Sequence, residues 1–231
     1  MQTNSSENQT IISPHNNSGT SLGESRQPKP PRQILDGLFS FHPNRETLGG
    51  TSYLIVENTG NILVDSPAWD SYNQQFLHQK GVRWLFLTHR GGIGKQVLHI
   101  QTTLGCEVVI QEQEAYLLPE VKVTPFEREF FLSPTCYGLW TPGHTPGSSC
   151  LYWNHHGGVL FTGRHLLPNP EGILTPLRTA KTFHWLRQLR GVELLRDRFS
   201  SETLTYVCPG ANIGFLRGRG ISRWAELNLK T

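Results

Sequence analysis

The sequence lacks any long apolar run, and no segment approaches the roughly 18 residues that a membrane-spanning helix needs. Its start, MQTNSSENQT, has neither a basic region nor an apolar core, so we expect no secretory signal. The formal net charge is only +3 over 231 residues, without the concentrated basic face that is typical of nucleic-acid-binding proteins. We therefore expect a cytoplasmic protein that binds neither membranes nor nucleic acids.

Cysteine is also scarce, with four residues far apart and no C-x-x-C pair. This spacing argues against a disulfide framework and against a zinc knuckle, and it predicts reduced, mostly buried thiols. Glycine (23) and proline (15) are by contrast plentiful, which favours many turns over a helical bundle. The four cysteines are Cys106, Cys136, Cys150 and Cys208.

The chain divides by composition into an arm and one folded domain. Residues 1 to about 29 are mainly Asn, Ser, Thr, Gln and Gly, and such a segment buries too little apolar surface to offset its ordering entropy. We therefore predict a disordered arm and linker over residues 1–32 and a single domain over residues 33–231. A plastid transit peptide is an alternative for the arm, but Glu7, Glu24 and the absence of Arg before Arg26 weaken it.

Short apolar, β-rich runs alternate with turn signals and a few helical patterns, which predicts two sheets with helices outside. The predicted strands are 51–56, 61–65, 83–89, 107–111, 128–132, 136–140, 149–153, 159–162 and 205–208. The predicted helices are 71–79, 94–104, 113–118, 180–198 and 223–229.

Three segments together resemble the metallo-β-lactamase fold of glyoxalase-II-like hydrolases. They are GGTSYLIVENTGNILVDSP, LFLTHRGGIGKQ at 85–96, and WTPGHTPGSSCLYW followed by LFTGRHLL. CPGAN at 208–212 stands where that family has a last metal-binding His. The resemblance spans about residues 46–216 and implies an α+β fold, the four-layer αββα sandwich. The chain also resembles, less specifically, uncharacterised cyanobacterial and plastid members of this family. That resemblance implies a location in the cytoplasm or the plastid stroma.

The resemblance implies a two-metal site, yet most of its ligand positions are changed. Only His89 and His144 keep a ligating side chain. His165 is a conceivable third ligand, but adjacent residues on an extended segment point to opposite sides, and Arg164 takes the other side. Because a catalytic zinc needs about three protein ligands, we expect no metal. The altered positions hold Gly91, Ile93, Gly94, Arg164 and Ala211.

Arg164 stands where the family has a bridging Asp, and its permanent charge would repel a dication. At ~4 Å and a dielectric of ~20, one unit-charge pair amounts to about 4 kcal/mol. We expect a metal-free, electropositive pocket in which Arg164, Arg90 and Lys95 receive an anionic or carbonyl group. Asn212 is a candidate hydrogen-bond partner for that ligand. Asp65 is expected to cap a turn or to form a salt bridge with Arg90 or Arg164.

The glycine-rich loop HRGGIGK at 89–95 has two interpretations of equal weight. Gly91 and Gly92 free the backbone before a predicted helix, whose first N–H groups would bind an anion. Alternatively, the glycines fill space left by lost ligands and form a tight turn. The loop is not a P-loop, because His89 and Gln96 replace residues that motif needs.

These features predict a metal-free pseudo-hydrolase that binds a small anionic molecule or a partner protein. One alternative is an active thioester or ester hydrolase with a rebuilt mononuclear zinc site, and another is a purely structural interaction module. No catalytic residue is predicted, because no nucleophile, base and orienting group come together in the sequence. Ser148 and Ser149 lie near His144 but suit an ordinary hairpin.

Overall fold

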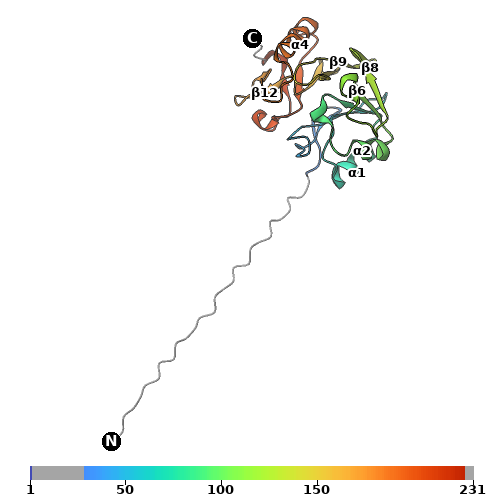
Figure 1. The fold of residues 1–231 in the computed structure, drawn as a ribbon, viewed down its shortest axis with the longest axis vertical. Coiled ribbons are helices and arrows are strands. Elements are labelled where there is room, and N and C mark those ends of the chain that lie inside the picture. The colour runs from blue at the N-terminus through green and yellow to red at the C-terminus, as the bar shows by residue number, and fades with distance from the viewer. Residues whose placement is uncertain (2–28, 227–231) are drawn as a thin grey trace.

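The first half of the chain builds one sheet, in a computed structural model that describes Met1 and residues 29–226 (Figure 1). Its seven strands neighbour one another in chain order. Pairing is antiparallel from β1 to β4 and parallel from β4 to β7. The strands are β1 (Arg32–Leu35), β2 (Leu38–Ser40), β3 (Tyr53–Ile55), β4 (Ile62–Val64), β5 (Trp84–Leu87), β6 (Glu107–Gln111) and β7 (Val123–Phe126).

Helices connect the parallel strands of this sheet, as parallel pairing requires. Helix α1 (Ser71–Lys80) begins where the Asp70 side chain accepts the Asn73 N–H, and it ends at Gly81, whose φ is +73°. Helix α2 (Val97–Leu104) ends at Gly105 in the left-handed conformation. A one-turn helix, α3 (Glu112–Ala115), follows β6, and the 3-10 turn η1 (Arg90–Gly92) follows β5.

The second half builds a six-stranded sheet in the order β15-β14-β11-β10-β9-β8. All its pairs are antiparallel except β11 with β14. Helix α4 (Trp185–Arg198) begins where His184 Nδ1 accepts the Arg187 N–H. The strands are β8 (Glu129–Ser133), β9 (Cys136–Trp140), β10 (Ser149–Trp153), β11 (Val159–Gly163), β14 (Tyr206–Pro209) and β15 (Ser222–Arg223). A hairpin of β12 (Leu167–Pro168) and β13 (Leu174–Thr175) and the 3-10 turns η2 (Ile213–Leu216) and η3 (Trp224–Glu226) complete the fold.

Three apolar cores define four layers. The central core lies between the sheets, where Phe86 of the first sheet and Trp153 and Phe161 of the second are buried. A second core joins the outer face of the first sheet to α1 and α2, and a third joins the second sheet to α4 through Val192 and Leu195. Figure 1 shows α1 and α2 on the opposite side of the molecule from α4. The predicted αββα sandwich is confirmed.

Several predicted elements differ in their bounds. The helix predicted over 94–104 begins at Val97, and that predicted over 180–198 begins at Trp185, because His184 caps it. The helix predicted over 113–118 is the single turn α3. The helix predicted over 223–229 is β15 followed by η3 as far as the structure describes it. No strand was predicted at β1, β2, β7, β12, β13 or β15.

Strand β1 begins at Arg32, the last residue of the predicted linker. The predicted arm otherwise lies almost wholly outside the described residues. All four cysteines are buried free thiols, as expected. No helix in the described part of the chain has the length and apolar character to cross a membrane.

Candidate functional site

The candidate site lies at the edge of the sandwich where parallel strands of both sheets end. Asp65 follows β4, His89 follows β5 and Arg164 follows β11. Carboxyl ends of parallel strands meet at one sheet edge, where α/β proteins place their ligands. The two edges adjoin, because the Ser149 N–H at the start of β10 donates to the carbonyl of Thr88 at 2.7 Å.

Asp65, Thr88 and His89 form a buried chain of hydrogen bonds. Asp65 Oδ1 accepts the Thr88 N–H at 2.8 Å, and Oδ2 accepts the Thr88 hydroxyl at 2.6 Å. A carboxylate only accepts, so the Thr88 oxygen is left to accept from His89 Nδ1, 2.9 Å away. This arrangement assigns the proton to Nδ1 and leaves a lone pair on His89 Nε2. Among the described residues this buried Nε2 has no hydrogen-bond partner.

Burial raises the pKa of Asp65 to about 6, against the opposing effect of its hydrogen bonds from Thr88. The carboxyl is therefore mainly ionised at neutral pH. Its role is neither of those predicted. The expected salt bridge is wrong, because the carboxylate is held by Thr88 while Arg90 and Arg164 contact other groups.

His89 and His144 meet with their ring centroids 5.3 Å apart and an interplanar angle of 64°. Their exposed fractions are only 2% and 6%. Burial, and then the charges of Arg164, Arg90 and Lys181, lower the pKa of His144 to about 4. Burial, His144 and Arg164 hold the pKa of His89 well below its usual range. Both imidazoles are neutral at pH 7.

Arg164 bridges β11 to the loop between β2 and β3. Its Nη2 donates to the carbonyls of Thr47 at 2.8 Å and Leu48 at 3.1 Å. Leu48 takes a left-handed backbone, φ 54°, in the loop that supplies these carbonyls. Arg164 Nε is buried and has no hydrogen-bond partner within the described ranges. One donor of the fork is thus left for a further acceptor.

Arg90 is held by an acid that sequence reasoning missed. Its Nε donates to Glu114 Oε1 at 2.9 Å, and the Glu114 side chain is fully buried while that of Arg90 is 42% exposed. A Cβ on Gly147 would lie 2.7 Å from Glu114 Cγ, so Glu114 also packs against the loop that carries His144. The only sequence signal was an acid three residues after a buried strand.

The glycine-rich loop forms a tight turn around the site rather than a helix N-terminus. A Cβ on Gly92 would lie 2.2 Å from Asp65 Oδ1, and one on Gly91 would lie 2.9 Å from His89 Nε2. Helix α2 begins only at Val97, beyond the loop. The close packing favours the tight-turn interpretation over the anion-binding one.

Two predicted ligand-binding residues lie outside this cluster. Lys95 is exposed and lines a separate cavity with Ile93 and Leu118. Asn212 is exposed in the left-handed conformation, φ 59°, and its side chain does not cap η2. The structure therefore brings together Asp65, His89, His144 and Arg164, with Arg90 and its acid at the margin.

His165 packs against α4, where its backbone carbonyl accepts from Gln188 Nε2 at 2.9 Å. It is 1% exposed, and a Cβ on Gly191 of α4 would lie 2.6 Å from its Cε1. Burial, and to a lesser degree His144, lower its pKa to about 3. Within residues 29–226, no three His, Cys, Asp or Glu side chains are placed to hold a metal ion.

The residues present do not fit a catalytic zinc. Two imidazoles supply lone pairs, whereas such a zinc needs about three protein ligands. The charge of Arg164 already lowers the pKa of both rings, and it would act more strongly on a dication. The serines add no nucleophile: Ser148 Oγ binds the Thr145 N–H, and Ser149 Oγ donates to the Gly147 carbonyl.

No protein-family model and no curated protein sequence matches the chain. Solved structures, by contrast, do match its fold. ST1585 from Sulfolobus tokodaii, an archaeal metallo-β-lactamase superfamily protein, is 16% identical with a TM-score of 0.55, covering 76% of this chain and 79% of its own. BLEG-1, a B3 metallo-β-lactamase, is 14% identical with a TM-score of 0.61, covering 82% and 95%. TMB-1 is 14% identical with a TM-score of 0.64, covering 87% and 93%.

These likenesses define the chain as a protein of the metallo-β-lactamase fold, as the sequence resemblance implied. At identities of 14–16% they establish the architecture alone, because one fold supports many activities. What the site does follows from its own residues.

Proposed function

We propose that this protein is a metal-free pseudo-hydrolase whose site binds a small anionic ligand through Arg164. The observation that carries the proposal is the buried Nε of Arg164, which has no hydrogen-bond partner in the described part of the chain. Its neighbours Asp65 and Thr88 are already committed to each other. An anionic or carbonyl oxygen of a ligand would satisfy this donor with a charge-assisted hydrogen bond.

The neutral state of the two histidines supports the same proposal. An uncharged imidazole with Nε2 unprotonated accepts a hydrogen bond, so His89 suits the protonated or hydroxyl part of the same ligand. Arg164 would therefore hold an acceptor and His89 a donor. A small hydroxy acid or a monoprotonated phosphate carries both groups. A partner protein would satisfy the site only by inserting an acidic side chain.

A thermal-shift screen of small carboxylates and phosphates, including inorganic phosphate and glycolate, tests this proposal. Calorimetry then compares the best binder on the wild type, Arg164→Lys and Arg164→Asp. We expect Arg164→Lys to weaken binding about tenfold or more, since hydrogen bonds to charged groups contribute about 1.5–3 kcal/mol. Arg164→Asp should abolish binding, because it reverses the charge at this position. Arg196→Asp, on the exposed side of α4, is the matched control, and equal affinities in all four proteins would refute the proposal.

A second candidate is a hydrolase with a rebuilt mononuclear metal site. Two observations favour it: His89 Nε2 has no hydrogen-bond partner among the described residues, and the His144 ring lies 5.3 Å from the His89 ring between centroids. Metal content per chain separates the two proposals, because only a rebuilt metal site would retain a full equivalent of metal.

A further inference from the structure

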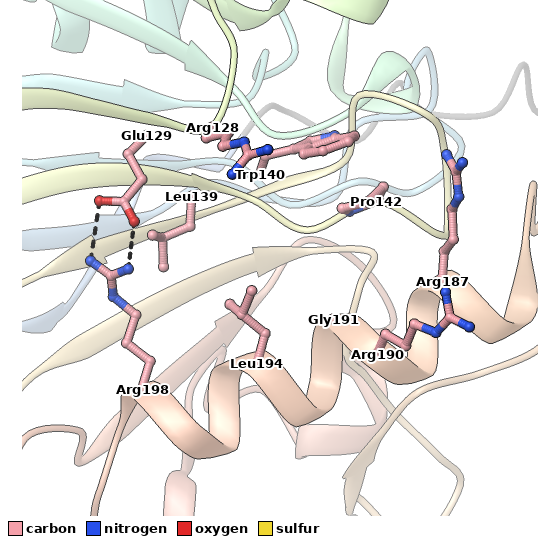
Figure 2. Close-up of a pocket in the computed structure, with 10 residues that line it drawn as sticks. All are labelled: Arg128, Glu129, Leu139, Trp140, Pro142, Arg187, Arg190, Gly191, Leu194 and Arg198. Atoms are coloured by element: carbon pink, nitrogen blue, oxygen red, sulfur yellow. Dashed lines mark hydrogen bonds and ion pairs between the residues drawn. The ribbon is translucent and has the colours of Figure 1, made fainter.

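A separate cavity of about 540 Å³ lies between α4 and the strands β8 and β9 (Figure 2). Its α4 side is a single helical stripe with spacing 3, 1, 3 and 4, formed by Arg187, Arg190, Gly191, Leu194 and Arg198. Neither Asp65, His89 nor Arg164 lines it, so it is distinct from the histidine site. Its volume lies within the range of small-molecule pockets, about 300–1,000 Å³.

The middle of the cavity is apolar and partly rigid. Figure 2 shows Leu194 of α4 facing Leu139 of β9, with Trp140 and Pro142 along the strand side. Leu194 is 45% exposed, which leaves apolar surface for a ligand to cover. The Trp140 ring is fixed because its Nε1 donates to the Pro146 carbonyl at 2.8 Å. Fixed aromatic walls bind apolar groups at little entropic cost.

The rim of the cavity carries an excess of positive charge. Arg198 is paired with Glu129, Nη2 to Oε2 at 3.2 Å, at one end. Arg187 and Arg190 lie at the other end (Figure 2). Their side chains, and that of Arg128, make no hydrogen bond or ion pair with any residue that the structure describes. Several positive charges around a cavity with low-dielectric walls attract an anion from solution.

We propose that this cavity, which we call the α4 groove, binds an amphipathic carboxylate with an alkyl body of medium length. The alkyl chain lies between Leu139 and Leu194 against Trp140. The carboxylate reaches Arg187 and Arg190, whose planar guanidinium groups match its two oxygens. The Arg198–Glu129 pair bounds the far end of the groove, so the alkyl chain ends before it, on the apolar surface of Leu139 and Leu194. The carboxylate thus meets positive charge, and the alkyl body meets apolar surface.

The first arm of the test is calorimetry on the full chain with decanoate, hexanoate, acetate and decanol. We expect decanoate to bind, hexanoate to bind more weakly, since each buried methylene strengthens binding about fourfold, and acetate and decanol to show no measurable binding. Decyl phosphate distinguishes a carboxylate site from a general anion site. Equal affinity for decanol would mean a merely apolar groove and would overturn the proposal.

The second arm compares variants at the two ends of the groove. Arg187→Gln with Arg190→Gln should weaken decanoate binding at least about tenfold, the loss expected for charge-assisted hydrogen bonds. Arg196→Gln, on α4 but outside the groove, should leave it unchanged, and so should Arg164→Lys at the histidine site. Leu194→Asn, at a position that is 45% exposed, should reduce the dependence on chain length. Unchanged decanoate affinity in the double variant would overturn the proposal even if Arg164 binds its own anion.

Discussion

The imidazoles of His89 and His144 stand edge to face, with 5.3 Å between their centroids. Both lie in a neutral state, because burial and the charge of Arg164 lower their pKa values. Two neutral rings are thereby held together in a positively charged setting that lacks a third donor.

The first prediction concerns metal content. Protein purified without chelator should hold less than one zinc or iron per chain, because two imidazoles cannot close a site against Arg164. Elemental analysis measures the ratio. His78→Ala, on the exposed side of α1, is the control. A full equivalent of metal that disappears in His89→Ala or His144→Ala, but not in the control, would establish the alternative hydrolase.

The second prediction is a loss of stability in acid. An unfolded histidine binds its proton near pH 6.5, whereas folded His144 binds it near pH 4 and His165 near pH 3. Between pH 6.5 and 4 the unfolded state binds more protons, so acid favours unfolding. Asp65 has the opposite effect between about pH 6 and 3.8, because its folded pKa is raised. Three buried histidines, His89 included, outweigh that one carboxyl.

Urea unfolding at pH 7, 6 and 5 measures this effect. The free energy of unfolding should fall by about 1.4 kcal/mol per pH unit for each excess proton taken up on unfolding. His144→Gln should reduce the slope, and His78→Gln should leave it unchanged. A stability that rose on acidification would show that Asp65, not the histidines, dominates.

The third prediction concerns the close approach of Gly92 to Asp65. Gly92→Ala would put a methyl group 2.2 Å from Asp65 Oδ1, and overpacking of a rigid site costs about 1–3 kcal/mol. The carboxylate cannot move aside without giving up Thr88. Gly214→Ala is the matched control, because nothing lies within 4 Å of its added Cβ. Chemical denaturation should separate the two variants, and equal stabilities would argue that the loop has room to rearrange.

The fourth prediction concerns the polar N-terminal segment. Removal of residues 1–29 should lower the melting temperature by less than about 4 °C, the scale of a 1 kcal/mol loss in a domain of this size or smaller. The reason is compositional, since the segment offers few apolar side chains to a core. A larger drop in a thermal melt would mean that the segment packs on the domain.

The sequence predicted the layers well because buried strands and glycine-terminated helices leave strong local signals. Gly81 and Gly105 end α1 and α2 in the way that their positions indicated. Strand β7 was not predicted because it contains Pro125, and proline normally argues against a strand. It is tolerated because β7 lies at the edge of the first sheet and pairs only with β6.

The site was predictable only in part. The sequence shows which charged residues are present, but it does not show which partner each of them contacts. Fold resemblance placed His89, His144 and Asp65 near one another. Arg90 pairs with Glu114, which lies 24 residues further along the chain. Arg164 donates to the backbone carbonyls of Thr47 and Leu48, and the position of these carbonyls depends on the left-handed turn at Leu48. Such partners follow from tertiary geometry, not from residue type.

The order of strands also has a consequence for synthesis on the ribosome. The first sheet uses residues 32–126 and the second begins at Glu129, so every strand of the first sheet emerges before any strand of the second. Its inner face, which includes Phe86 and Phe126, has no cover until the later half has left the exit tunnel. The half-made chain is therefore the stage most prone to aggregate, and it is where a nascent-chain chaperone would have the most apolar surface to hold.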